Sequence, residues 1–144
     1  MIPRQARQPQ PLKAEAVRVR PGRIEVGVRI SARRYLQTDG ALAQRCLQHA
    51  PTLGQHACRN EVGPLFGAVM ARTSTPHLLE HLVVDAQTRA ARKADSVFTG
   101  TTQFSAEDPL LANLALSYED DLVALHALKE SLEFLNRTLL EQRG

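Results

Sequence analysis

The fold is decided by one stretch of sequence, VRVRPGRIEVGVRI at residues 17–30. Apolar and polar residues alternate on both sides of its central Pro21-Gly22 pair. The apolar positions are Val17 and Val19 before the pair and Ile24, Val26, Val28 and Ile30 after it. Alternation with a period of two is typical of strands with one buried face, and a Pro-Gly pair is typical of a tight turn. The stretch therefore predicts a β-hairpin that turns one face toward a core.

The remaining chain divides into helical and extended patterns. Helices are predicted at residues 39–48, 64–71 and 76–94, and strands at residues 97–103 and 110–117. From Glu119 onward leucines recur at spacings of three and four, which is typical of a long amphipathic helix. With the short helix at 64–71 left aside, the order ββααββα contains hairpins and no βαβ repeat. It favours an α+β fold, an open sandwich of a mostly antiparallel sheet with helices packed on one face.

Domain organisation follows from the same patterns. Residues 1–13 are proline-rich and basic and show no apolar periodicity, so we expect a flexible arm there. Residues 14–144 are of ordinary length for a single domain, and no internal repeat or second boundary interrupts them.

Composition limits the class of function. Aromatic residues make up 4% of the chain, tryptophan is absent and the net charge is only +3, so nucleic-acid binding is not expected. No apolar run reaches membrane-spanning length and the N-terminus lacks a hydrophobic signal core. We therefore expect a cytoplasmic protein without a membrane interaction.

The chemically most informative motif is H-x-x-E-H, formed by His77, Glu80 and His81 just inside a predicted helix start. Thr75 suits the N-cap and Pro76 the first helical position. Positions i, i+3 and i+4 share one helix face, so the two imidazoles can bind one metal ion with the carboxylate beside it. The motif predicts a zinc site with His77 and His81 as ligands and Glu80 as general base.

The chain from about residue 50 to 135 resembles the N-terminal domain of cyanophycin synthetases. The resemblance rests on the order and spacing of five segments. They are Pro51-Thr52-Leu53, His56-Ala57-Cys58, His77 to His81 with Gln87 six residues on, Gly100-Thr101-Thr102, and Tyr118-Glu119-Asp120. In the synthetases the loop after the motif helix bears arginine, whereas here it reads Gly100-Thr101-Thr102-Gln103.

The resemblance implies a domain that holds a polymer of aspartate and arginine, with a zinc-peptidase-like site in some members. We expect a stand-alone protein without the two ATP-using modules of a complete synthetase. A separate synthetase partner and a homodimer are both compatible with the sequence.

The third metal ligand is open at this stage. Catalytic zinc usually has three protein ligands. His56 is our prediction, because it matches the family histidine and imidazole is a good zinc ligand. Cys58 is the next candidate, since S-ribosylhomocysteine lyases combine the same helix motif with a cysteine. Carboxylates downstream of the motif are further alternatives, namely Glu107, Glu119, Asp120 and Asp121.

Three functions compete. The first is a zinc-dependent hydrolase of a peptide or isopeptide bond, with a cyanophycin-like substrate. The second is a non-catalytic module that tethers a charged polymer or a partner synthetase through arginines on the exposed hairpin face. These arginines are Arg18, Arg20, Arg23 and Arg29. The third is an assembly subunit in which the histidines only pack.

Overall fold

The computed structural model describes residues 9–58 and 62–144. The strands are β1 (Leu12–Arg20), β2 (Arg23–Ile30), β3 (Gly100–Phe104) and β4 (Leu111–Ser117). The α-helices are α1 (Gly40–His49), α2 (Thr75–Ala90) and α3 (Asp121–Arg143). Short 3-10 helices are η1 (Arg33–Tyr35), η2 (Leu53–Gln55) and η3 (Phe66–Ala68).

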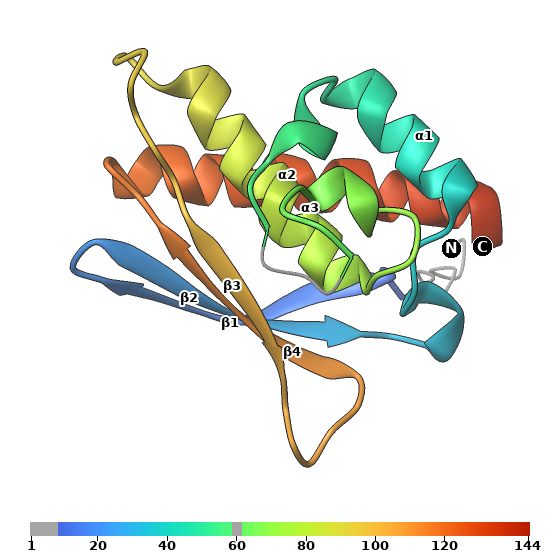
Figure 1. Cartoon of the computed structure of the whole chain (residues 1–144). Coiled ribbons are helices and arrows are strands. Elements are labelled where there is room, and N and C mark those ends of the chain that lie inside the picture. The colour runs from blue at the N-terminus through green and yellow to red at the C-terminus, as the bar shows by residue number, and fades with distance from the viewer. Residues whose placement is uncertain (1–8, 59–61) are drawn as a thin grey trace, which may run out of the picture.

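The strands form one antiparallel sheet in the order β1-β2-β4-β3, and the helices cover one of its faces (Figure 1). This arrangement confirms the predicted α+β sandwich. Within the described ranges, no helix combines the length and apolar character needed to cross a bilayer.

The hairpin forms at the predicted place. Gly22 adopts a φ of 78°, a left-handed conformation that glycine reaches without steric cost. Strand β2 then alternates as expected, and its four apolar side chains are buried against the helices. Strand β4 lies beside β2 and adds the buried residues Ala112, Leu114 and Leu116.

Strand β1 departs from the predicted one-sided burial. Its register against β2 shifts between Ala14 and Ala16, a bulge that keeps Val17 and Val19 on the helix-facing side. However, β1 is an edge strand, and Val17 and Val19 remain 42% and 47% exposed. The helices therefore do not fully cover this part of the sheet.

The predicted boundary of the N-terminal arm is two residues too late, because β1 begins at Leu12. Leu12 is 1% exposed. The buried amide of Asn136 in α3 accepts a hydrogen bond from the Leu12 N–H at 2.8 Å and donates one to its carbonyl at 2.9 Å. Residues 1–8 of the predicted arm lie outside the described residues.

We expect Asn136→Leu to destabilise the protein, because it leaves the N–H and carbonyl of Leu12 without their partner in a buried setting. The loss in free energy of unfolding should be about 2–3 kcal/mol, measured by urea denaturation. Asn113→Ala on the exposed side of β4 is the matched control and should change little. Equal stability of the two variants would show that the Asn136 bridge contributes nothing.

Candidate metal centre

The H-x-x-E-H motif occupies the first two turns of α2. Ser74 is the N-cap, where its hydroxyl accepts a hydrogen bond from the His77 N–H at 3.3 Å, so the cap lies one residue before the predicted Thr75. Thr75 is buried instead and donates to the carbonyl of Tyr35 at 2.7 Å. The helix ends at Ala90 and not near residue 94. The hydrogen bonds of Ser74 and Thr75 thus fix the first turn of α2, where the motif begins.

Within the described residues, three side chains form a group that could hold a metal ion, namely Cys58, His77 and His81. One ligand atom from each lies within 4.8 Å of the others. The Cys58 Sγ is 3.4 Å from His77 Nε2, and the two imidazole centroids are 5.0 Å apart. Two imidazoles and one thiolate are ligands that zinc and other borderline-soft metals favour. The convergence predicted for His77 and His81 is present in the structure.

Phe66 of η3 fixes the orientation of both imidazoles. Its ring is fully buried, stacks on His81 at 3.9 Å and meets His77 edge-on at 5.1 Å. On its other edge, His77 places Nδ1 2.8 Å from the Thr73 hydroxyl. When Nε2 is the ligand atom, Nδ1 carries the proton and donates it to Thr73, an outer contact typical of metal-bound histidines.

His56 does not belong to this group. It lies on the same extended segment as Cys58, and that segment is held by backbone hydrogen bonds from Phe66 N to His56 O and from Cys58 N to Pro64 O. The His56 Nδ1 is 3.3 Å from His81 Nδ1, and its Nε2 is 3.4 Å from Asp85 Oδ1. Cys58 therefore belongs to the group of potential metal ligands, whereas His56, the predicted third ligand, lies between His81 and the carboxylate of Asp85.

Asp85 organises the outer side of this cluster. It is 2% exposed and one turn beyond His81 on α2. Its carboxylate accepts hydrogen bonds from Thr52 Oγ1 at 3.1 Å and Arg89 Nε at 2.8 Å. Burial alone would raise the pKa of Asp85, but the hydrogen bonds from His56, Arg89 and Thr52 outweigh it and lower the pKa. Asp85 is thus an anion that anchors the segment carrying His56 and Cys58.

Glu80 lies beside the cluster and faces β3. It is 5% exposed, its Oε1 accepts a 2.7 Å hydrogen bond from the Thr102 hydroxyl, and its Oε2 is 3.5 Å from His81 Nε2. A Cβ on Gly100 would come within 2.7 Å of the Glu80 Cγ, so the glycine gives this carboxylate its space. Burial raises the pKa of Glu80, although the hydrogen bond from Thr102 works against it.

Both motif imidazoles are kept neutral by their surroundings. Burial lowers the pKa of His77, and burial together with the nearby His77 and His56 lowers the pKa of His81 to about 3. A neutral imidazole is the form that binds metal. The two ligand candidates are therefore ready to coordinate across the physiological pH range.

The depressed pKa of His81 predicts acid sensitivity of the metal-free protein. The ordinary pKa is 6.5, so between pH 6.5 and about 3 the unfolded chain binds a proton that the folded chain excludes. By linkage the free energy of unfolding should fall progressively as the pH drops through this window. The raised pKa of Glu80 acts in the opposite direction.

Urea denaturation of chelator-treated protein at several pH values measures this effect. His81→Gln should flatten the pH dependence, whereas His126→Gln should leave it unchanged, because His126 is exposed on α3, where it pairs with Glu130. The same slope in His81→Gln and in the unaltered chain would contradict the assignment.

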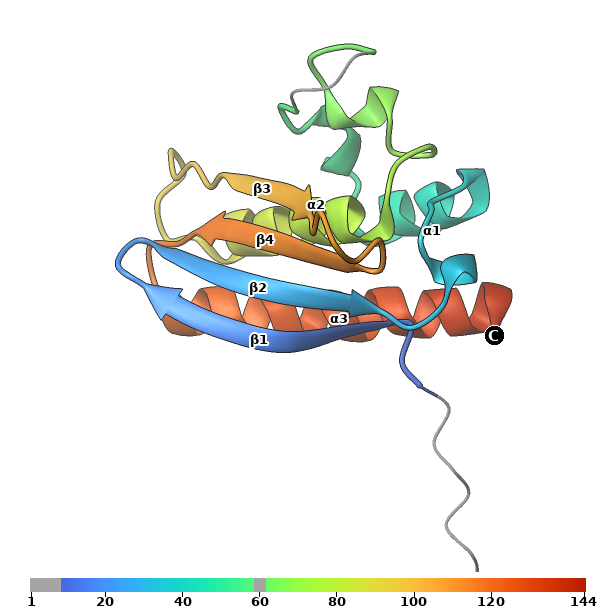
Figure 2. The same cartoon turned by 90° about the horizontal axis from the view of Figure 1, so that it is seen from below.

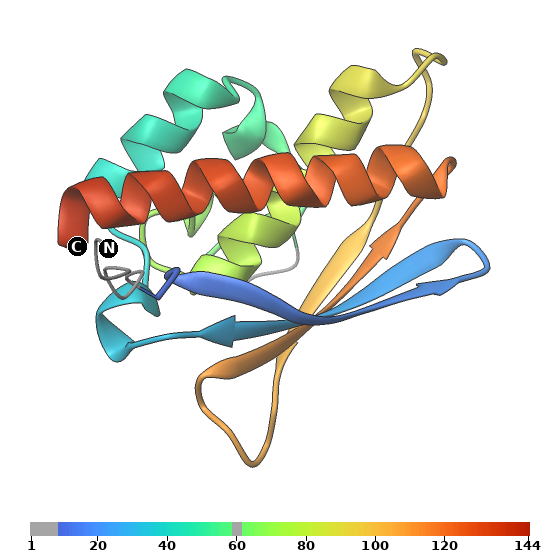
Figure 3. The same ribbon diagram turned by 180° about the vertical axis from the view of Figure 1, so that it is seen from behind.

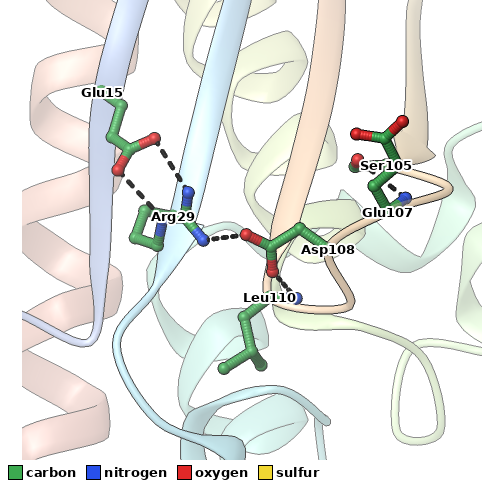
Figure 4. A network of polar contacts seen from close by, with 6 residues as sticks. All are labelled: Glu15, Arg29, Ser105, Glu107, Asp108 and Leu110. Atoms are coloured by element: carbon green, nitrogen blue, oxygen red, sulfur yellow. Dashed lines mark hydrogen bonds and ion pairs between the residues drawn. The ribbon is translucent and has the colours of Figure 1, made fainter.

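The downstream carboxylates considered as ligands have other roles. Glu119 accepts a hydrogen bond from the Ser96 hydroxyl at 2.8 Å, and Asp120 caps α3 by accepting from Leu122 N and Val123 N. Asp121 is exposed at the start of α3. Glu107 sits in the β3–β4 loop beside Ser105, as Figure 4 shows. None of the four lines the cleft at the cluster.

The cluster lines a cleft with a volume of about 1460 Å³. The cleft is bounded by the segment that carries His56 and Cys58, by α2 and by β3. Its floor carries the cluster and Glu80, and its wall toward β3 is partly apolar, with Val97, Phe98 and Phe104. The cluster and Glu80 therefore line a cleft beside β3, an edge strand of the sheet.

The arginines of the hairpin do not form a bare cationic surface. Arg20 and Arg23 both pair with Glu25, at 3.4 and 3.2 Å. Arg29 bridges Glu15 and Asp108, as Figure 4 shows. In the described part of the chain only Arg18 of the four lacks an ion pair. This pairing weakens the case for polymer tethering through the hairpin.

Comparison with known proteins does not assign the chain to a family. No protein-family model matches the chain, and a search of curated proteins finds no match. Neither comparison links the chain to cyanophycin synthetases.

Proposed function

We propose that the protein is a zinc-dependent hydrolase of a peptide or isopeptide bond. The observation that carries the proposal is the convergence of Cys58, His77 and His81 beside the buried carboxylate of Glu80 at the floor of an open cleft. A three-residue ligand set leaves a coordination position for water or substrate, which is the pattern of catalytic zinc sites. Structural zinc sites are closed by a fourth protein ligand.

In this proposal each residue has a defined part. Cys58, His77 and His81 hold the ion, and Thr73 and the Asp85–His56 pair orient the imidazoles. Zinc, when bound, would supply a Lewis acid that polarises a carbonyl and acidifies water. Glu80 would take a proton from the attacking water molecule and deliver it to the leaving amine. Its raised pKa makes it a better base than an exposed glutamate.

The substrate class is suggested by the cleft and by the sequence resemblance. The cleft is large enough for several residues of an extended chain, and Arg89 at its rim is already paired with Asp85. The resemblance suggests an aspartate–arginine isopeptide as the first substrate to test. Ordinary peptides with apolar residues are the second, because Val97 and Phe104 expose apolar surface along the cleft.

An assay with chelation and reconstitution tests the proposal. The protein, purified without chelator, is incubated with an aspartate–arginine isopeptide and with a set of ordinary peptides, and the released amine is quantified. We expect hydrolysis that a strong chelator abolishes and added zinc restores. Activity that persists after verified removal of metal would contradict the mechanism, and failure to cleave either class would contradict the function while leaving the metal site standing.

A further inference from the structure

A second surface, separate from the metal cleft, lies between β1 and α3. A groove of about 740 Å³ runs there, with Ala14 and Val17 on the strand side and Leu125, Leu128 and Leu132 on the helix side. We call it the β1–α3 groove. Figure 3 shows α3 lying along β1 at this edge of the sheet, and Figure 2 shows β1 as the outermost strand there. The metal-centre proposal assigns this groove no role.

The groove exposes apolar surface next to an edge strand. Val17 and Val19 point to the helix side of the sheet yet remain nearly half exposed, because α3 leaves them partly uncovered. Soluble proteins usually protect an edge strand of this length with a covering element or a partner. The position of the groove at the sheet edge allows a partner to cover strand and helix together.

The rim of the groove carries a self-complementary charge pattern. Lys129, Glu133, Arg137 and Glu141 follow one another at intervals of four residues on α3, so they share one helix face with alternating sign. Across the described structure, Lys129, Glu133 and Arg137 make no salt bridge, while Glu141 pairs with Arg45 at 3.1 Å. Read from Glu141 back to Lys129, the row shows the same alternation with each sign inverted, so two antiparallel copies of it place opposite charges side by side.

We infer that the β1–α3 groove binds a second copy of this chain in a two-fold symmetric dimer. Two antiparallel α3 helices related by an axis near Leu135 place Glu133 opposite Arg137 of the partner subunit, and Lys129 opposite Glu141 of the partner subunit. A two-fold interface requires each patch to complement itself, and this row of charges meets that requirement. The exposed valines of both edge strands then lie toward the two ends of the interface, because β1 runs from Leu12 beside Asn136 to Arg20 beside Tyr118.

Sedimentation equilibrium of the full chain at micromolar concentration tests the inference. We expect a dimer whose dissociation constant rises at least about tenfold in Glu133→Arg, since two symmetry-related pairs become repulsive. The double variant Glu133→Arg/Arg137→Glu restores the pairing with reversed signs and should restore the dimer. Val17→Asp should weaken it independently, by introducing a charge into the apolar part of the groove.

Arg18→Glu is the matched control, because Arg18 is exposed on the same strand but points to the opposite face of the sheet. It should leave the dissociation constant unchanged, and circular dichroism should confirm that all variants fold. A monomeric native chain overturns the inference. A dimer that tolerates both Val17→Asp and Glu133→Arg, or that the double variant fails to restore, overturns it as well.

Discussion

Cys58→Ser and His81→Ala should each lower the affinity for zinc by at least about 10³-fold, because each removes one of three protein ligands from a site whose binding energy is divided among few bonds. The native chain, purified without chelator, should carry close to one zinc per chain. Competition with a chromophoric chelator measures the affinity, and metal analysis measures the content. His126→Gln, far from the cluster on the exposed side of α3, should bind zinc like the native chain.

His56→Gln decides between the two candidates for the third ligand. A histidine that only orients His81 and contacts Asp85 is an outer residue, and its loss should cost about 10- to 100-fold in affinity. If His56 is itself a ligand, His56→Gln should lower the zinc affinity as much as the loss of His81 does. Cobalt substitution gives a second readout, since a thiolate-to-cobalt charge-transfer band requires Cys58 to be bound. A chain that binds no zinc, or one in which Cys58→Ser binds like the native chain, contradicts the proposed cluster.

The elements that could be predicted from sequence are those whose signal is local. The hairpin at Pro21-Gly22, the helix at residues 39–48 and the long leucine-patterned helix are all predicted at about the right residues, and α1 has Asp39 as N-cap. The pairing of His77 with His81 is also local, because i and i+4 meet on any helix. Local periodicity is thus sufficient for the layers of the fold and for two of the three residues of the cluster.

The choice between His56 and Cys58 depends on contacts that are distant in sequence. Residues i and i+2 of an extended segment face the same side and are about 6.6 Å apart, close to the rise of one helical turn. Both side chains therefore face α2, with Cys58 beside His77 and His56 beside His81 and Asp85. The backbone pairing with residues 64–66 and the contacts of Asp85 with Thr52 and His56 fix this alignment, and the sequence contains no separate signal for it.

Two further residues of the site had weaker signals. Asp85 lies at i+4 from His81 on the motif helix, so its position facing the cluster could have been inferred from helical spacing. The position of Thr102 could not have been inferred, because its contact with Glu80 depends on how β3 lies against α2. The boundary of the arm was wrong for a similar reason: the partner of Leu12 is Asn136, 124 residues away.

Glu80→Gln should reduce hydrolysis at least about 10²-fold while zinc stays bound, as expected for the loss of a general base. Glutamine keeps the size of the side chain and can still accept the hydrogen bond from Thr102, so the packing against Gly100 and β3 is preserved. What it loses is the basic oxygen. Steady-state kinetics together with metal content distinguishes this outcome from a loss of the ion.

Stability offers an independent check on the role of Glu80. A carboxylate with 5% exposure carries a desolvation cost when ionised, and its raised pKa reflects that cost. Glu80→Gln removes the charge, so the free energy of unfolding of the metal-free protein at neutral pH should stay equal or rise. A residue kept at the expense of stability is typical of function. Loss of zinc in this variant would make Glu80 a ligand, and full activity with zinc retained would place the general base elsewhere in the chain.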